Sequence, residues 1–92
     1  MAKFLIEAQH ADDKADCLRA VQIFLSSGSH FLTNADWGCE DGEHKAWIIV
    51  EMPSKEEARM ILPPSIRPQA KIVKLTKFST EDIESMLSEH QP

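Results

Sequence analysis

Residues 29–51, SHFLTNADWGCEDGEHKAWIIVE, read as two extended segments joined by an Asp41-Gly42 turn. Asp-Gly between segments rich in β-branched and aromatic residues is typical of a tight β-hairpin with a type I′ turn, because both central residues of that turn need positive φ. The stretch also contains both tryptophans and two of the four histidines of the chain. The other elements are expected to pack around this hairpin.

The two-residue turn predicts which hairpin residues pair and which face of the sheet each one occupies. The expected pairs are Glu40–Glu43, Cys39–His44, Trp37–Ala46, Ala35–Ile48 and Thr33–Val50. One face is then largely apolar and is expected in the core, with Phe31, Thr33, Ala35, Trp37, Ala46, Ile48 and Val50. The other face is mixed, with His30, Leu32, Asn34, Asp36, Lys45, Trp47, Ile49 and Glu51. A three-residue loop would shift the pairing by one residue and regroup both faces.

A strand and a helix are expected before the hairpin. Residues 3–9 alternate, with Phe4, Ile6 and Ala8 on one side, which is typical of a strand. Residues 11–27 form a helix whose apolar positions recur at 3.6-residue spacing, namely Ala11, Ala15, Leu18, Val21 and Leu25. Gly28 supplies the end of this helix.

Two helices and a strand are expected after the hairpin. Ser54 and Glu57 form a capping box at the start of a short helix that continues through Leu62 and ends at a Pro-Pro pair. Residues 70–77, AKIVKLTK, read as a final strand whose lysines suit a sheet edge. A last helix is capped by Ser79 or Thr80 and has an apolar face of Ile83, Met86 and Leu87.

The element order is strand, helix, strand, strand, helix, strand, helix. It predicts an α+β domain of ferredoxin-like βαββαβ topology over residues 1–78 and an extra C-terminal helix and tail over residues 79–92. Right-handed crossovers give a four-stranded antiparallel sheet in the order 4-1-3-2, with both main helices on one face. The other face carries Leu5, Leu32, Trp47 and Ile49. Because such a face is too apolar for water, either the last helix or a second subunit is expected to cover it.

Composition indicates a soluble globular domain. Of the 92 residues, 42% are hydrophobic and 27% are charged, and the longest apolar run, residues 46–50, cannot span a bilayer. The net charge of −5 argues against a general nucleic-acid binder. One basic stretch leaves open either an anionic ligand or a solvated strand edge, and it consists of Arg67, Lys71, Lys74 and Lys77.

The N-terminus and the cysteines predict the compartment. Residues 1–9 lack the apolar segment of a signal peptide, so a cytoplasmic protein is expected. Cys17 and Cys39 do not form a disulfide framework or a CxxC pair, and both are expected to be reduced. Cys17 is expected to be a small packed residue of the first helix.

In length, element order and the passage WIIVEMPSKEEA, residues 47–58, the chain resembles the dimeric α+β barrel superfamily, in particular muconolactone isomerase and YCII-related proteins. The segments GSHFL, residues 28–32, and ADWGC, residues 35–39, also resemble a family of small uncharacterised bacterial proteins. The superfamily resemblance implies a homodimer in which two open sheet faces pack together as a barrel. Its members include isomerases, cofactor-free monooxygenases, haem enzymes and ligand-sensing domains, so the resemblance selects no activity and carries over no catalytic residue.

The predicted sheet order places the candidate catalytic residues at one edge of the sheet. Asp36, His10 and His44 gather there, whereas His30 is expected at the far edge. An imidazole titrates near neutral pH, and a desolvated carboxylate does so as well. Asp36, His10 and His44 are therefore expected to transfer protons. Four further residues are expected to bind the ligand: Asn34, Trp47, Trp37 and Glu7. Two alternatives stay open, namely a salt bridge of Asp36 with Lys45 and plain core packing of the tryptophans.

Nitrogen, oxygen and sulfur donors of the types that suit zinc are present in His10, Asp36, Cys39 and His44. Their spacing matches no known metal motif, so neither a metal nor a cofactor is expected. The leading hypothesis is a cofactor-independent isomerase or monooxygenase that acts on a small organic substrate in a homodimeric barrel. The alternative is a non-catalytic ligand-binding or dimerisation domain, and a pocket in which a carboxylate and an imidazole converge would favour catalysis. Expected partners are a second copy and a small organic ligand, with no nucleic acid and no membrane.

Overall fold

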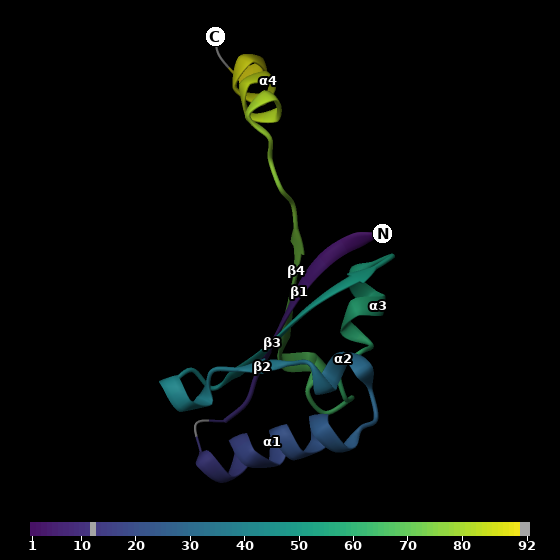
Figure 1. Ribbon diagram of the computed structural model, residues 1–92, viewed down its shortest axis with the longest axis vertical. Coiled ribbons are helices and arrows are strands. Elements are labelled where there is room, and N and C mark those ends of the chain that lie inside the picture. Colours follow the sequence, from purple (N-terminus) through teal and green to yellow (C-terminus); the bar gives the residue numbers. More distant parts are fainter. Residues whose placement is uncertain (12, 91–92) are drawn as a thin grey trace.

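A computed structural model describes residues 1–11 and 13–90, so Asp12 and the end of the predicted tail lie outside it. Within those residues the chain has an α+β fold with a four-stranded antiparallel sheet (Figure 1). The strands are β1 (Ala2–Gln9), β2 (Asp36–Trp37), β3 (Lys45–Met52) and β4 (Ala70–Leu75). Their order, β2-β3-β1-β4, is the predicted order read from the opposite edge, so that prediction is confirmed.

Most cross-strand residue pairs involve the two central strands, β1 and β3. Leu5 of β1 pairs with Ile49 of β3 on one side and with Val73 of β4 on the other. At the edge of the sheet, Trp37 of β2 pairs with Ala46 of β3, as the hairpin pattern predicted. Side chains alternate across such a ladder, so these pairs determine which residues face the helices and which face away.

The first strand of the predicted hairpin is mostly wrong, because four of its residues form a short helix, α2 (His30–Thr33). The hydroxyl of Ser29 accepts a hydrogen bond from the backbone N–H of Leu32 at 3.3 Å and caps this turn. The pairs Ala35–Ile48 and Thr33–Val50 therefore do not form, since β2 contains only two residues. Leu32 is buried although it was predicted on the open face, and Phe31 is exposed although it was predicted in the core.

The predicted two-residue turn is also wrong. A 3₁₀ turn over Cys39–Asp41 precedes Gly42, and Gly42 alone takes the left-handed conformation there, with φ +83°. The backbone N–H groups of Asp41 and Glu43 both donate to the carbonyl of Gly38, at 3.0 and 2.9 Å. The loop is thus longer than two residues, and the β2–β3 ladder ends before the predicted pairs Cys39–His44 and Glu40–Glu43.

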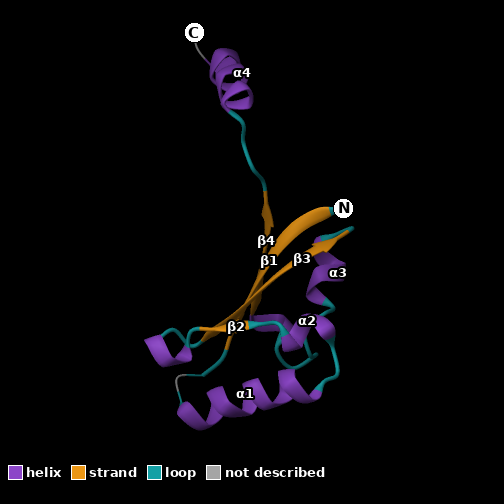
Figure 2. Cartoon of the chain, in the orientation of Figure 1, coloured by secondary structure: helices purple, strands orange, loops and turns teal. Residues whose placement is uncertain are grey.

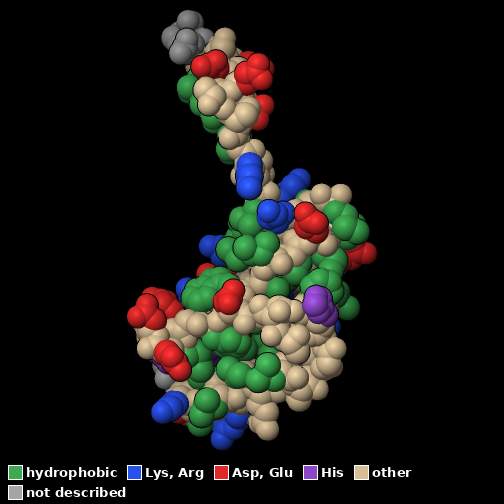
Figure 3. Space-filling view, viewed as in Figure 1, with side chains coloured by type: hydrophobic (Ala, Val, Ile, Leu, Met, Phe, Trp, Pro, Cys, Tyr) green, Lys and Arg blue, Asp and Glu red, His purple; other side chains and the backbone are tan. Residues whose placement is uncertain are grey.

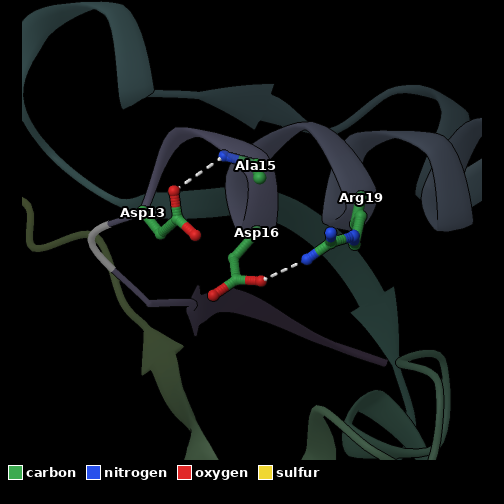
Figure 4. Close-up of polar contacts among 4 residues, drawn as sticks. All are labelled: Asp13, Ala15, Asp16 and Arg19. Atoms are coloured by element: carbon green, nitrogen blue, oxygen red, sulfur yellow. Dashed lines mark hydrogen bonds and ion pairs between the residues drawn. The ribbon is translucent and has the colours of Figure 1, made fainter.

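Helix α1 (Lys14–Ser26) forms where expected but buries a different face. It begins at Asp13, whose carboxylate accepts from the N–H of Ala15 at 3.1 Å, and its first turn holds an exposed Asp16–Arg19 ion pair (Figure 4). Its buried residues are Cys17, Ala20 and Phe24. The predicted stripe is mostly exposed, and it includes Leu18 and Leu25, each 59% exposed. The large Phe24 ring determines the outcome by packing against Trp37, 4.9 Å away between ring centroids.

The core lies between the helices and one face of the sheet (Figure 2). Helix α3 (Lys55–Arg59) begins at Ser54, whose hydroxyl accepts from the N–H of Glu57 at 3.2 Å, as the capping pattern predicted. The strands contribute Phe4, Ile6, Ala8, Ala46, Ile48, Val50 and Ile72 to the core, and the helical side contributes Phe24, Leu32, Ala58 and Leu62. The opposite face of the sheet remains open, with Ile49 at its centre 63% exposed.

Helix α4 (Thr80–His90) projects from the end of β4 and does not cover the open face (Figure 1). The molecule measures 55 × 28 × 20 Å and has a radius of gyration of 16.6 Å. A compact chain of this length has a radius of about 12 Å, and the projecting arm explains the excess. Every residue of α4 is exposed, and apolar and acidic side chains lie on different sides of it (Figure 3). Among the described residues, no helix is long and apolar enough to cross a membrane.

Candidate functional site

A groove of about 630 Å³ lies on the open face, where α2 meets β3. Its polar lining comes from His30, Asn34, Asp36 and Glu51, while Trp47 and Ile49 supply apolar surface. Ligand sites typically combine an apolar lining with a few polar groups that orient the bound molecule. This groove therefore has the composition of a small-molecule site.

Trp47 is fixed in the groove by a hydrogen bond to Glu7. The indole N–H donates to Oε1 of Glu7 at 3.1 Å, and Oε2 of the same carboxylate lies 3.8 Å from Nζ of Lys45. Lys45 thus pairs with Glu7 instead of Asp36, whose side chain is exposed in the groove. Glu7 orients the tryptophan, and the Asp36 carboxylate faces the space that a ligand would occupy.

A second group of side chains lies on the helix-covered side of the same sheet. The rings of His10 and His44 are 5.7 Å apart between centroids and nearly perpendicular. Nε2 of His10 lies 3.1 Å from Sγ of Cys39. One nitrogen from each histidine and the Cys39 sulfur all lie within 4.8 Å of one another. We call these three residues the His10–Cys39–His44 cluster.

Cys39 is joined to Cys17 by a disulfide, so the expectation of two reduced thiols is wrong for this state of the protein. The bond connects α1 to the loop between β2 and β3. Because a disulfide sulfur carries no proton, the contact with His10 has the imidazole N–H as donor and the sulfur as acceptor. Cys17 is buried, as expected for a packed helix residue.

The structure divides the predicted site residues between the two sides of the sheet. Asn34, Asp36 and Trp47 line the groove of the open face, with Glu7 behind the indole. His44 and Trp37 line a cavity on the other side, and His10 lies beside Trp37, 5.8 Å away between ring centroids. The predicted proton carriers therefore do not share one cavity, since Asp36 is separated from both histidines by the sheet.

Two residues in these sites were not predicted to belong there. His30 was placed at the far edge of the sheet, but it lines the groove because the residues around it form α2 instead of extended chain. The Ser29 cap was the available signal for this helix, and it was outweighed by the aromatic and β-branched residues nearby. The second such residue is Cys17, because the sequence spacing of two distant cysteines does not indicate that they are in contact.

Comparison with known proteins adds no relative. No protein-family model, curated protein or solved structure matches the chain. The resemblance to the dimeric α+β barrel superfamily therefore remains an expectation. Function must be inferred from the groove and the His10–Cys39–His44 cluster themselves.

Proposed function

We propose that the chain acts as a homodimer that binds a small organic ligand in the groove of its open sheet face. The observation that carries this proposal is the groove itself, which brings an oriented indole together with an amide and a carboxylate beside apolar residues. Polar groups of this kind are not needed for packing between two sheets. They are suited to recognising a bound molecule.

The open face favours a second copy as its cover. Ile49, Leu5 and Val73 are neighbours across three strands and make an apolar centre, in which Ile49 is exposed and the other two are half-buried in a single chain. Charges of both signs surround this centre, in the cross-strand pairs Lys3–Glu51 and Glu7–Lys71. A surface with both signs of charge is able to complement itself across a two-fold axis. A dimer of this kind would match the barrel implied by the superfamily resemblance.

The lining of the groove suggests the chemistry of its ligand. The Trp47 ring offers a flat apolar surface for a planar molecule. The Asn34 amide both donates and accepts hydrogen bonds, and the Asp36 carboxylate only accepts them when ionised. A compact, planar molecule with a hydroxyl or amino group meets these requirements, whereas an acid would be repelled by Asp36.

A proton-transfer enzyme of the isomerase or cofactor-independent monooxygenase type is the second candidate function. It is favoured by one observation, namely that the Asp36 carboxylate and the His30 imidazole line the same groove. Asp36 would take a proton from the substrate, and His30 would replace the predicted His10 and His44 as the neighbouring proton carrier. Conversion of a bound substrate to product would distinguish this candidate function from simple binding.

Phenol is a suitable probe for the groove, because it is planar and carries one hydroxyl. In an NMR titration, phenol should shift the indole N–H signal of Trp47 and the ring signals of His30 and leave those of His10 and His44 unchanged. Asp36→Asn should weaken the response, and Asp16→Asn, an exposed carboxylate of α1, is the matched control. If the signals of His10 and His44 move while Trp47 stays still, the groove is not the binding site.

A further inference from the structure

The His10–Cys39–His44 cluster has a fourth potential metal ligand in Cys17. Its sulfur is bonded directly to that of Cys39, so two sulfurs and two imidazoles lie together. Three separate segments carry them: the residue after β1, helix α1, and the loop between β2 and β3, which holds both Cys39 and His44. The backbone N–H of His10 donates to the carbonyl of His44 at 3.1 Å, which fixes the two histidines side by side.

A buried nitrogen of His44 provides a second, independent observation. Within residues 1–11 and 13–90, Nδ1 of His44 is buried and has no hydrogen-bond partner. Buried polar atoms are nearly always paired, so an orphaned one indicates an absent ion or water. Asp36, which was considered among the metal donors, lies across the sheet and is not part of this group.

We propose that His10, Cys17, Cys39 and His44 bind one zinc-class divalent ion when the disulfide is reduced, and that the disulfide and the ion are alternative occupants of this site. Two thiolates and two imidazoles are a common donor set for tetrahedral zinc. In such a site neighbouring donor atoms lie roughly 3.3–3.8 Å apart, given Zn–S and Zn–N bonds of about 2.3 and 2.0–2.1 Å. The donor atoms of His10, Cys39 and His44 lie within 4.8 Å of one another, and the Cys17 sulfur is bonded to that of Cys39, so side-chain movements after reduction would complete the geometry.

The exchange of the disulfide for the metal ion takes two steps. An external dithiol gives two electrons and two protons to the Cys17–Cys39 disulfide, which becomes two thiols while the dithiol becomes a cyclic disulfide. The ion then forms a bond to each sulfur, and each thiol releases its proton to water. Oxidation by a small-molecule disulfide reverses the sequence and expels the ion, because a disulfide sulfur is a poor ligand for zinc.

An entry path exists for the ion. A cavity of about 660 Å³ lies against the site and is lined by Cys17, Cys39 and His44. Lys14 and Glu40 also line it, so its charged groups have both signs. The site therefore lies beside an open cavity and is not sealed within the core.

Cobalt(II) alone is the appropriate probe, because its spectrum reports both geometry and thiolate ligation. The full chain should be reduced with a phosphine, which unlike a dithiol is a weak chelator, and then titrated with cobalt without air. We expect one ion per chain, with thiolate-to-cobalt charge-transfer absorption and tetrahedral visible bands that zinc abolishes. The oxidised protein should bind at least tenfold more weakly and show no charge-transfer band.

Single substitutions test two of the four ligands. His44→Asn and Cys17→Ser should each weaken cobalt binding at least tenfold, whereas His30→Asn, a histidine outside the cluster, should bind like the parent chain. Far-ultraviolet circular dichroism will show whether each variant is folded. A further test needs no variant: zinc should slow the alkylation of both cysteines in the reduced parent chain. Absence of the charge-transfer band in the reduced protein, or equal binding by the oxidised protein, would overturn the proposal.

Discussion

At the scale of single residues, two glycines of the loop between β2 and β3 are needed for different physical reasons. Gly42 has φ +83°, a conformation that side chains with a Cβ rarely adopt, although the space around it is open. Gly38 has a negative φ, but a Cβ there would lie 2.7 Å from Cζ3 of Trp47 and 2.8 Å from the carbonyl oxygen of Glu43. The first position is constrained by backbone conformation and the second by contact.

Replacing Gly42 with valine should lower the free energy of unfolding by about 1–2 kcal/mol, because a β-branched residue tolerates the left-handed conformation poorly. Asparagine enters that conformation much more readily, so Gly42→Asn is the matched control and should lose less stability. Urea denaturation of the three proteins measures the difference. Equal stability of the valine variant and the parent would show that the loop does not hold this conformation in solution.

Replacing Gly38 with alanine should lower the free energy of unfolding by about 1–3 kcal/mol, since the added methyl meets the Glu43 backbone, which cannot easily move. The change should also shift the indole N–H signal of Trp47, because the methyl contacts that ring. Gly42→Ala adds the same methyl in open space and should leave the Trp47 signal in place. If both variants move the indole equally, the effect is on the loop as a whole and not on the Gly38 contact.

At the scale of elements, the sequence predicts the central strands and the helix caps better than it predicts which face of a helix is buried. The alternation of β1 and the apolar run of β3 fix their buried residues correctly, and the order of elements is enough to predict the order of the sheet. Residues 30–33 were misread because a short apolar segment suits a strand and a helical turn equally. On α1 two apolar stripes compete, and only the tertiary contacts of Phe24 and the Cys17–Cys39 bond select between them.

The sequence also predicts part of the candidate site, namely the part that depends on strand pairing. Asn34, Asp36 and Trp47 do line one groove, because Asp36 and Trp47 are cross-strand partners in the register that the sequence predicts. The sequence did not predict which histidines lie on the groove side of the sheet. Their positions depend on where each strand ends. One residue of difference moves a side chain to the opposite face.

Helix α4 depends on a charged cap. The Asp82 carboxylate accepts a hydrogen bond from the backbone N–H of Ser79 at 3.1 Å, and the Ser79 hydroxyl accepts one from the N–H of Asp82. The hydrogen bonds from Ser79 lower the pKa of Asp82 below its usual value. The cap therefore stabilises α4 fully above the ordinary pKa of an aspartate, and this stabilisation is lost as the pH falls through the lowered value.

Acidification should accordingly reduce the helicity of α4, which backbone chemical shifts of the intact chain will measure. Asp82→Asn is the matched control: it should be less helical at neutral pH, and it should lack the portion of the acid transition that belongs to Asp82. The other carboxylates of α4, at Glu81, Glu84 and Glu89, are the same in both proteins, so their contribution cancels in the comparison. Identical acid transitions in the two proteins would show that the Ser79–Asp82 cap does not form in solution.

At the scale of the whole molecule, the open sheet face and the projecting α4 both leave apolar surface in water. Ile49 is 63% exposed on the sheet, and Leu87 is 56% exposed on α4. A second copy bound to the open sheet face would cover the first of these two surfaces.

Ile49→Glu should raise the dissociation constant of the dimer at least tenfold, or about 1.4 kcal/mol, because the symmetry of the dimer places the new carboxylate in the interface twice. Leu25→Glu introduces the same charge at an exposed leucine on the opposite side of the molecule and should leave the dimer intact. Sedimentation velocity at micromolar concentrations will measure both. A parent chain that sediments as a monomer, or a dimer that Ile49→Glu leaves unchanged, would show that the open face is not the interface. The groove would then have to bind its ligand without a second sheet to close it.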